Sequence, residues 1–232
     1  MKNISSRAVA IIPAAGSGIR METKRAKQFL SLDGKPILAL TLEPFQESTV
    51  AAVILVVPQD EVEYCRKEIV ERFGFTKVDK IVPGGRRRQD SVRLGLQATE
   101  GKYDVVLIHD GVRPLIEKEL IERVIEEAMT SRAVITALPA RETVKEVNAL
   151  QHVVKTYDRE RVWMVQTPQA FRYRDILNAH YKALKEGWEE ATDDALLAEK
   201  SGLTVKVIEG SEKNIKVTTP HDLELARLLL RS

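Results

Sequence analysis

The stretch Ala8-Val9-Ala10-Ile11-Ile12-Pro13-Ala14-Ala15-Gly16-Ser17-Gly18-Ile19-Arg20-Met21 decides the fold. Its first five residues are apolar and partly β-branched, which predicts a short buried strand. The loop that follows is small and glycine-rich, so its backbone N–H groups can approach a phosphate closely. A loop of this kind directly after a buried strand is typical of α/β sheets, which bind ligands at the carboxyl ends of their strands.

The loop does not match two common nucleotide-binding motifs. A dinucleotide fingerprint needs a third glycine where Met21 stands, and a P-loop needs Gly-Lys-Ser or Gly-Lys-Thr, which the sequence lacks. Gly16 and Gly18 alone would also suit a purely structural turn. Arg20 and Lys27 favour a phosphate-binding loop, because permanent cations beside an amide-rich loop are what a triphosphate requires.

Outward from this loop, short β-branched runs alternate with longer helical patterns. The predicted strands are Ala8–Ile12, Ala52–Val57, Lys80–Val82, Val105–His109, Ala133–Leu138 and Thr204–Ile208. The predicted helices are Pro36–Gln46, Asp60–Phe73, Gln89–Ala98, Glu117–Met129, Tyr173–Lys185, Asp193–Ser201 and one that begins at Thr219-Pro220. This alternation predicts a single Rossmann-like α/β domain over residues 1–232, with a mainly parallel sheet and helices on both faces.

One segment breaks the alternation. From Arg141 to Tyr157 the sequence is polar and alternating, with Asn148 and Ala149 near its middle. The pattern predicts a protruding β-hairpin arm, at about residues 139–160, that has too little apolar surface to stand alone. A second subunit packed on the arm and a solvated surface hairpin are both consistent with it.

Composition excludes several classes of protein. The 232 residues can bury one sizeable core, and a formal net charge of +2 is too small for a nucleic-acid coat. The single cysteine, Cys65, excludes an internal disulfide, and its helical context predicts a buried structural thiol. The longest apolar run, Val50–Val57, is too short to cross a bilayer, and the N-terminus lacks a signal-peptide pattern. We therefore expect a cytoplasmic protein without nucleic-acid or membrane partners.

Two further motifs follow predicted strands. Gly84-Gly85-Arg86-Arg87-Arg88-Gln89-Asp90-Ser91-Val92 joins two glycines to three arginines, although a solvated charge run at a helix start is the alternative. His109-Asp110-Gly111-Val112-Arg113-Pro114 places an aspartate and an arginine after a buried strand. Asp110 suits either Mg²⁺ or a substrate hydroxyl, whereas His109 is interpreted as an ordinary packed histidine.

Two late motifs are weaker. Thr192-Asp193-Asp194 is fully explained as a helix N-cap with acidic first-turn residues. Lys216, within Asn214–Thr218, alternates with Ile215 and Val217 and would lie on the opposite strand face from them. Alone it would be an ordinary surface lysine.

The candidate residues supply many fixed cations and at least one carboxylate, and no nucleophile or acid–base pair is evident. A phosphate monoester is largely ionised near neutral pH, because its second pKa is about 6. Its oxygen can therefore attack the α-phosphorus of a triphosphate without a general base. The protein then has to bring two anions together and stabilise charge as pyrophosphate departs. The sequence predicts a magnesium-dependent nucleotidyltransferase that acts on a sugar- or polyol-phosphate.

Taken together and in order, the motifs resemble those of the 2-C-methyl-D-erythritol 4-phosphate cytidylyltransferases of the non-mevalonate isoprenoid pathway. They cover nearly the whole chain. The matching segments are P-A-A-G-x-G-x-R-M with K-Q-F-L (13–21 and 27–30), G-G-x-x-R-x-x-S-V (84–92), H-D-x-x-R-P (109–114), T-P-Q-x-F (167–171), T-D-D (192–194) and N-I-K-V-T (214–218).

The resemblance implies that CTP and 2-C-methyl-D-erythritol 4-phosphate react, with Mg²⁺, to give the cytidine-diphosphate adduct and pyrophosphate. It implies that Arg20 and Lys27 stabilise the pentacoordinate α-phosphorus and that Arg159 and Lys216 position the substrate phosphate. The implied nucleotide-binding residues are Pro13, Ala14, Ala15, Gly16, Gly18, Gly84, Gly85, Ser91 and Gly111. The implied polyol-phosphate-binding residues are Asp110, Arg113, Thr143, Thr167 and Thr192. Asp110 is also the leading candidate for a metal ligand.

In this family the arm crosses to a partner subunit. The resemblance therefore implies a homodimer in which Thr143 and Arg159 serve the neighbour's site. The chain departs from the family pattern in two places. Gly111-Val112 stands where two alanines are common, which should alter loop packing more than chemistry. Arg86-Arg87 adds positive charge where an acidic residue often lies, which bears on side-chain recognition of cytidine.

Three other interpretations stay open. The nearest is a ribitol 5-phosphate cytidylyltransferase, which would use the same nucleotide loops with a different polyol pocket. A nicotinamide-dependent oxidoreductase is disfavoured by Met21. A non-catalytic nucleotide-binding module would bind CTP and release no pyrophosphate.

Overall fold

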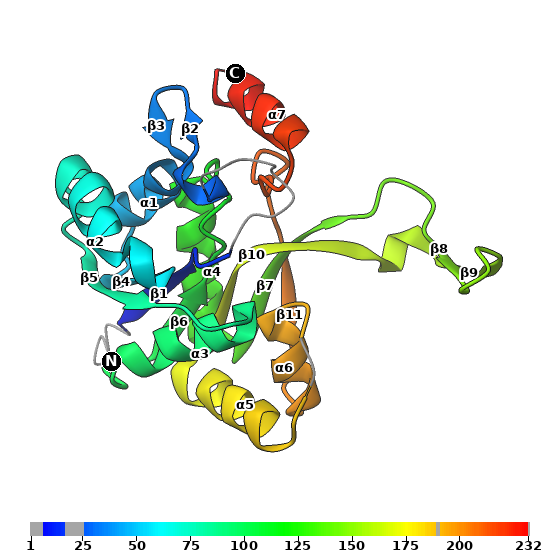
Figure 1. Cartoon of the computed structure of the whole chain (residues 1–232). Coiled ribbons are helices and arrows are strands. Elements are labelled where there is room, and N and C mark those ends of the chain that lie inside the picture. The colour runs from blue at the N-terminus through cyan, green and yellow to red at the C-terminus, as the bar shows by residue number, and fades with distance from the viewer. Residues whose placement is uncertain (1–6, 17–25, 189–190, 232) are drawn as a thin grey trace.

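The computed structural model of the chain describes residues 7–16, 26–188 and 191–231. A seven-stranded sheet runs through the body in the order β11-β7-β10-β6-β1-β4-β5 (Figure 1). Its strands are β1 (Ala8–Pro13), β4 (Ala52–Val57), β5 (Val78–Pro83), β6 (Val105–Ile108), β7 (Ala133–Pro139), β10 (Trp163–Arg172) and β11 (Lys206–Glu209). The mainly parallel α/β sheet predicted from the sequence is confirmed.

Helices cover both faces of this sheet, and each face has its own apolar core. Ala10 and Ile12 of β1 belong to one core, and Val9 and Ile11 belong to the other, because successive residues of a strand point to opposite faces. The helices of the first face are α1 (Ile37–Glu47) and α4 (Lys118–Thr130), and those of the second are α3 (Arg88–Ala98), α5 (Tyr173–Lys185) and α6 (Asp194–Lys200).

None of the helices in the described part of the chain is long and apolar enough to span a membrane.

No strand is predicted at β10, which lies inside the sheet and runs antiparallel to both β6 and β7. Pro168, near its middle, has no N–H to donate, and this argues against a central strand. In the structure the pairing with β7 shifts register between Val165 and Gln169, so Pro168 falls at an irregularity. The strand therefore accommodates a proline that would break a regular ladder.

The helix predicted over Asp60–Phe73 differs from the structure. It is divided into a 3₁₀ turn, a short helix and a π-helical segment, and Cys65 is buried as predicted. The final helix, α7 (Pro220–Leu230), begins after Thr219 as predicted. Thr219 Oγ1 accepts a hydrogen bond from Asp222 N at 3.2 Å, and the Asp222 carboxylate accepts one from Thr219 N at 2.8 Å. The other short elements are β2 (Ser31–Leu32), β3 (Lys35–Pro36), α2 (Val62–Tyr64), the π-helical segment Cys65–Glu71 and the 3₁₀ turns Lys27–Phe29, Gln59–Glu61 and Arg159–Arg161.

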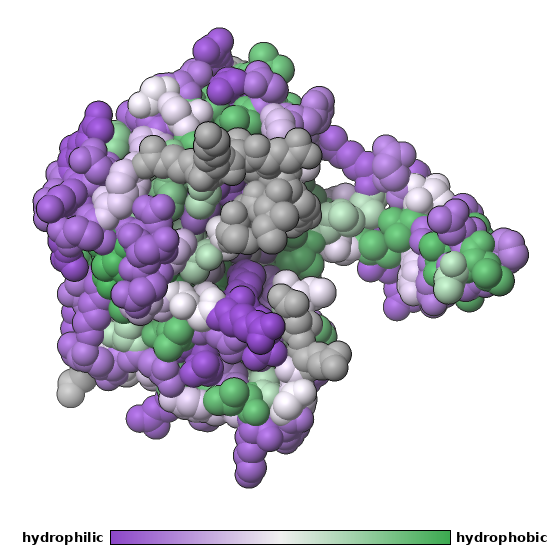
Figure 2. Space-filling model, viewed as in Figure 1, coloured by the Kyte–Doolittle hydropathy of each residue, from purple (hydrophilic) through white to green (hydrophobic). Residues whose placement is uncertain are grey.

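An arm extends from the body between β7 and β10 (Figure 1). At its far end, β8 (Lys145–Val147) and β9 (Val153–Thr156) pair as an antiparallel hairpin, which confirms the predicted hairpin. Apolar side chains gather on the arm (Figure 2), and Leu150 and Val154 are 74% and 61% exposed in the single chain.

The carboxyl ends of β1, β5 and β6 lie at one edge of the sheet, because these strands run parallel to one another through β4. The loops after them begin at Ala14, Gly84 and His109. The fold thus brings together three segments that the sequence analysis singled out separately.

Candidate active site

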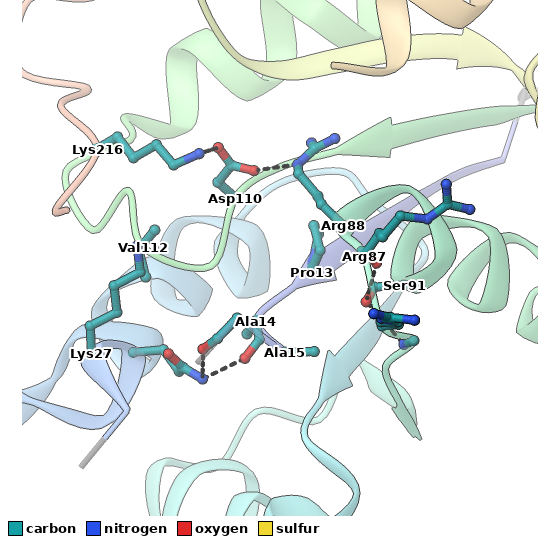
Figure 3. Close-up of a pocket in the computed structure, with 14 residues that line it drawn as sticks. Pro13, Ala14, Ala15, Lys27, Arg87, Arg88, Ser91, Asp110, Val112 and Lys216 are labelled. Atoms are coloured by element: carbon teal, nitrogen blue, oxygen red, sulfur yellow. Dashed lines mark hydrogen bonds and ion pairs between the residues drawn. The ribbon is translucent and has the colours of Figure 1, made fainter. Parts of the chain in front are cut away.

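The first cavity lies among these strand-end loops and has a volume of about 400 Å³ (Figure 3). Its wall carries five lysine or arginine side chains and, among the described residues, one carboxylate, Asp110. Such a wall suits a small, strongly anionic ligand. Its lining residues are Pro13, Ala14, Ala15, Gly16, Lys27, Gln28, Gly85, Arg86, Arg87, Arg88, Ser91, Asp110, Val112 and Lys216.

Gln28 holds the first loop in shape. Its side chain is 1% exposed, on the 3₁₀ turn Lys27–Phe29. Gln28 Nε2 donates hydrogen bonds to the carbonyl oxygens of Ala14, at 2.6 Å, and Gly16, at 3.3 Å. On the other side, Ala14 N donates to the carbonyl oxygen of Val56 in β4, at 2.7 Å. The backbone of the loop is therefore fixed from two sides before any ligand binds.

Gln28→Glu should raise the KM for the nucleotide about tenfold, because a carboxylate would face two backbone carbonyls that then lose their donor. Gln46→Glu is the matched control, since Gln46 Nε2 bonds Thr76 Oγ1 at 2.9 Å, outside the cavity. Steady-state kinetics with purified variants checks both. A Gln28→Glu enzyme with the parent KM would contradict the role given to this side chain.

Gly84 and Gly111 lie behind the first loop and do not line the cavity. A Cβ on Gly84 would lie 2.2 Å from Ala15 Cβ, and one on Gly111 would lie 2.8 Å from Ala14 Cβ. Both positions let neighbouring backbone approach the loop closely. The structure thus shows a packing role for both glycines, and their nucleotide contact stays a prediction. Many family members have alanine at position 111. The short distance from a Cβ there to Ala14 explains why such an alanine would alter the packing of the loop.

Gly84→Ala should push the first loop towards the cavity and raise the KM for the nucleotide, by about tenfold if the shift costs one loop hydrogen bond. The double variant Gly84→Ala/Ala15→Gly removes the methyl group of Ala15 that the added Cβ would strike, and it should recover part of the loss. Kinetics and melting temperatures of the three proteins test this. Equal KM values in the single and double variants would contradict the steric explanation.

Ser91 and Asp90 shape the second loop, at the start of α3. Ser91 Oγ accepts a hydrogen bond from Gly85 N at 3.1 Å and donates to the carbonyl oxygen of Arg87 at 3.1 Å. The Asp90 carboxylate accepts from Arg87 Nε at 3.0 Å and from Arg87 Nη2 at 3.1 Å. Hydrogen bonding to Arg87 holds the pKa of Asp90 below its usual value. The three arginines are therefore only partly a solvated charge run.

Asp110 lies at the far wall of the first cavity among three cations. Its carboxylate oxygens are 3.1 Å from Arg88 Nε, 2.9 Å from Lys216 Nζ and 3.8 Å from Arg113 Nε. Figure 3 shows the first two contacts. Burial alone would raise the pKa of Asp110, but the cations hold it well below its usual range. Asp110 is therefore a fixed negative charge at neutral pH.

The second cavity, of about 280 Å³, lies on the other side of this cluster. Arg88, Asp110 and Lys216 line both cavities and so form their common boundary. The residues that line the second cavity are Arg88, Asp110, Arg113, Val165, Gln166, Thr167, Gln169, Thr192, Asp193 and Lys216. Most of the predicted polyol-phosphate-binding residues are therefore in the wall of this cavity.

Thr167 lines the second cavity, and the buried His109 lies against it. Thr167 Oγ1 accepts a hydrogen bond from Asp110 N at 3.1 Å and lies 3.1 Å from His109 Nδ1. Burial and the nearby Arg113 lower the pKa of His109 to about 3, so the ring is neutral at physiological pH. The prediction of an ordinary packed histidine is confirmed.

The segment Asn214–Thr218 brings Lys216 to the boundary, although the structure assigns it no strand. Arg113 Nη1 donates to the carbonyl oxygen of Asn214 at 2.7 Å, and Asn214 Nδ2 donates to the carbonyl oxygen of Thr167 at 2.7 Å. Gln166 also ties this loop down, since its Nε2 donates to the carbonyl oxygen of Ser211 at 2.9 Å. Arg113 therefore has a structural contact in addition to its place in the cavity wall.

Four further predicted residues are not placed at the cavities, two of them because the structure does not describe them. Arg20 and Gly18 lie outside the described residues. Thr143 and Arg159 are exposed on the arm, and neither is among the described residues that line the two cavities. The arm carries them away from the body (Figure 1).

The described residues fit a metal that is held mainly by a bound triphosphate. They contain no group of three or more His, Cys, Asp or Glu side chains placed to hold an ion. Mg²⁺ is commonly bound by one or two carboxylates, water and substrate phosphates, which needs no such group. Asp110 is the available carboxylate in the first cavity, and both of its oxygens already contact cations. Its role as a metal ligand stays a prediction.

Three contributors stand in matched segments but were given no site role from the sequence: Gln28, Arg88 and Asp194. Arg88 bonds both Asp110 and Asp194, at 3.1 and 2.7 Å. The predicted helix cap is present, but it is Asp193, because α6 begins one residue later than predicted, and the Asp193 carboxylate accepts from Leu196 N at 2.9 Å. This local explanation hid the different role of Asp194. Gln28 is the glutamine of the matched K-Q-F-L segment, and that position was the available signal for it.

Comparison with known proteins agrees with this geometry. The family model described as 2-C-methyl-D-erythritol 4-phosphate cytidylyltransferase matches residues 8–232. The chain is 45% identical over 226 residues to the enzyme of that name from Syntrophus aciditrophicus, covering 97% of this chain and 96% of that protein. It is 47% identical to the one from Geotalea uraniireducens, covering 97% of each.

Solved structures agree as well. The 4-diphosphocytidyl-2C-methyl-D-erythritol synthase from Anaerococcus prevotii has a TM-score of 0.85 at 33% identity, covering 98% of this chain and 99% of that one. The 2-C-methyl-D-erythritol 4-phosphate cytidylyltransferase from Thermus thermophilus has a TM-score of 0.80 at 31% identity, covering 97% of this chain and 100% of that one. Fold and sequence therefore point to the same group of proteins.

Proposed function

The chain belongs to the 2-C-methyl-D-erythritol 4-phosphate cytidylyltransferase family, and we propose that its two cavities hold the two substrates of that reaction side by side. It is a nucleotidyltransferase that joins CTP and 2-C-methyl-D-erythritol 4-phosphate, giving 4-diphosphocytidyl-2-C-methyl-D-erythritol and pyrophosphate. The observation that carries the placement is the common boundary of the cavities, formed by Arg88, Asp110 and Lys216.

CTP occupies the first cavity. Small residues of the first loop leave backbone N–H groups within reach of phosphate oxygens, and Gln28 holds that backbone in place. Lys27 and the arginines of the second loop supply positive charge around the same space. The triphosphate lies along this basic wall, with its α-phosphorus towards the boundary.

The polyol phosphate occupies the second cavity, with its phosphate towards the boundary. Lys216 and Arg113 are cations there, and Thr167, Thr192 and Asp110 offer hydrogen-bonding groups for hydroxyls. An oxygen of the phosphate monoester attacks the α-phosphorus, and a new P–O bond forms. The bond to the bridging oxygen of the β-phosphate breaks, and its electron pair leaves with pyrophosphate. Fixed cations stabilise the charge that develops in this step.

Mg²⁺ bound with the triphosphate would neutralise part of its charge. Asp110 is the one carboxylate among the described residues that line the first cavity, and it would be the ligand from the protein if it exchanged one of its cation contacts for the ion. The chain's own cations then have to neutralise less of the charge of the triphosphate, and their task is to orient it.

A cytoplasmic location is expected for an enzyme that uses CTP.

The arm assembles a homodimer and delivers Thr143 and Arg159 to the neighbour's second cavity. Support comes from the exposure of both residues and from the apolar side chains that the arm leaves uncovered, including Leu150, Val154 and Met164. An exposed apolar patch of this kind favours a protein partner. Light scattering should give a dimer for the whole chain and a monomer after deletion of residues 141–157.

Pyrophosphate release, screened over the four nucleoside triphosphates with each polyol phosphate, tests the function. We expect release with CTP and 2-C-methyl-D-erythritol 4-phosphate. Turnover of ribitol 5-phosphate in its place would assign the alternative substrate. CTP binding by calorimetry without any release would leave a non-catalytic nucleotide-binding module.

A further inference from the structure

Arg88 lies where the two cavities meet; it is the arginine of the matched G-G-x-x-R segment, but the roles carried over from the resemblance do not include it. It is the first residue of α3, and its side chain lines both cavities. The other two residues that do so, Asp110 and Lys216, are both among the residues expected to contact the polyol phosphate. Arg88 is therefore placed like a substrate-contacting residue.

Two carboxylates hold its guanidinium. Arg88 Nε donates to Asp110 Oδ1 at 3.1 Å, and Arg88 Nη1 donates to Asp194 Oδ2 at 2.7 Å. These contacts use two of the five N–H groups of an arginine. Within residues 7–16, 26–188 and 191–231, no acceptor is assigned to the remaining N–H groups, and the side chain is 24% exposed. They are available to ligand oxygens.

Asp194 contacts Arg88 from the buried side, away from both cavities. Its side chain is 1% exposed and lines neither cavity, although Thr192 and Asp193 line the second one. Its other oxygen, Oδ1, is 3.0 Å from Nε2 of His180 on α5, which is also buried. A carboxylate only accepts, so Nε2 carries the proton. Burial alone would raise the pKa of Asp194, but Arg88 and His180 hold it below its usual value.

We propose that Arg88 contacts the phosphates of both substrates at the boundary, and that Asp194 and His180 are positioning residues that act through it. The inference rests on the proposed function, because it needs one substrate in each cavity. A guanidinium fixed before the substrates arrive needs no reorganisation as charge develops at the α-phosphorus. Its planar fork can hold oxygens of two phosphates at once, whereas lysine offers a single point charge.

Arg88→Lys keeps the charge and removes the fork, so it should lower kcat about 10²-fold while the KM of each substrate changes less than about tenfold. Asp194→Asn keeps the shape and releases the guanidinium, and it should lower kcat about tenfold. The matched control is Arg132→Lys, because Arg132 also donates two hydrogen bonds to aspartate oxygens, both of Asp175, at 2.8 and 2.6 Å, and lies outside both cavities. It should keep the parent kcat.

Two variants at His180 distinguish a positioning role from a contribution to stability alone. His180→Gln keeps an N–H near the place of Nε2, and His180→Leu removes it, so His180→Gln should retain more of the parent kcat. All variants are measured well below their melting temperatures, with the folded fraction determined by circular dichroism. An unchanged kcat in Arg88→Lys overturns the proposal. Should Arg88→Lys fail to fold, Asp194→Asn decides, and a loss that only follows the folded fraction overturns it too. A parent protein that releases no pyrophosphate refutes the proposed function instead.

Discussion

Lys27→Ala should lower kcat by about 10²–10³-fold and change the KM for CTP by less than about tenfold. Lys27 lines the first cavity on the same 3₁₀ turn as Gln28, whose contacts fix the first loop. Its charge is worth most when pyrophosphate leaves, because negative charge is then greatest around the α-phosphorus. Pyrophosphate release at saturating substrate, followed by titration of CTP, separates the two constants.

Lys35→Ala is the matched control for this experiment. Lys35 is a lysine of β3 that pairs with Glu43 at 2.6 Å and lines neither cavity. It should turn over at the parent rate. The family resemblance predicts a loss of similar size for Arg20→Ala. A Lys27→Ala enzyme with unchanged turnover would remove Lys27 from its role in the reaction.

Mixing two inactive subunits should restore activity if the site is shared between subunits. Arg159→Ala and Lys216→Ala should each lose most of their turnover as homodimers. In a mixed dimer one site would combine an intact Lys216 with an intact Arg159 from the partner, and the other site would lack both. Random mixing makes half of the dimers mixed, so about a quarter of the parent activity should return in a symmetric dimer.

The control for mixing is a pair of variants on the same side of the site. Lys216→Ala mixed with Lys27→Ala should regain nothing, because both residues line the first cavity of one body and every site in a mixed dimer lacks one of them. Subunits are mixed by unfolding and refolding together, or by co-expression with two purification tags. If the mixture of Arg159→Ala and Lys216→Ala contains mixed dimers but regains no activity, the two subunits do not share a site.

Local patterns predicted most of the sheet and the helices. β1 and β4 are apolar and buried almost throughout, and α7 has a complete capping signal at Thr219. β10 was missed because Pro168 argues against a central strand, and the register shift that accommodates it depends on pairing with β7. Such a shift is a tertiary property that a single strand does not encode.

The candidate site was predictable where backbone loops form it and less so where distant side chains meet. Ala14, Gly85 and Asp110 each follow a strand, so their shared edge follows from the parallel sheet. The Arg88–Asp194 contact joins residues 106 positions apart. Asp194 already had a sufficient local role at the start of α6, and nothing local distinguishes it from an ordinary first-turn aspartate.

The continuity of β7 and β10 has a consequence for how two copies would associate. Their pairing runs from Phe171 opposite Ala133, inside the sheet, to Trp163 opposite Pro139, at the base of the arm. The base of the arm is therefore a continuation of the core, and its direction is inherited from the twist of the sheet. A preorganised element loses little conformational entropy on association. In the proposed dimer, the angle between the subunits would thus be set by the folding of each monomer, before the two meet.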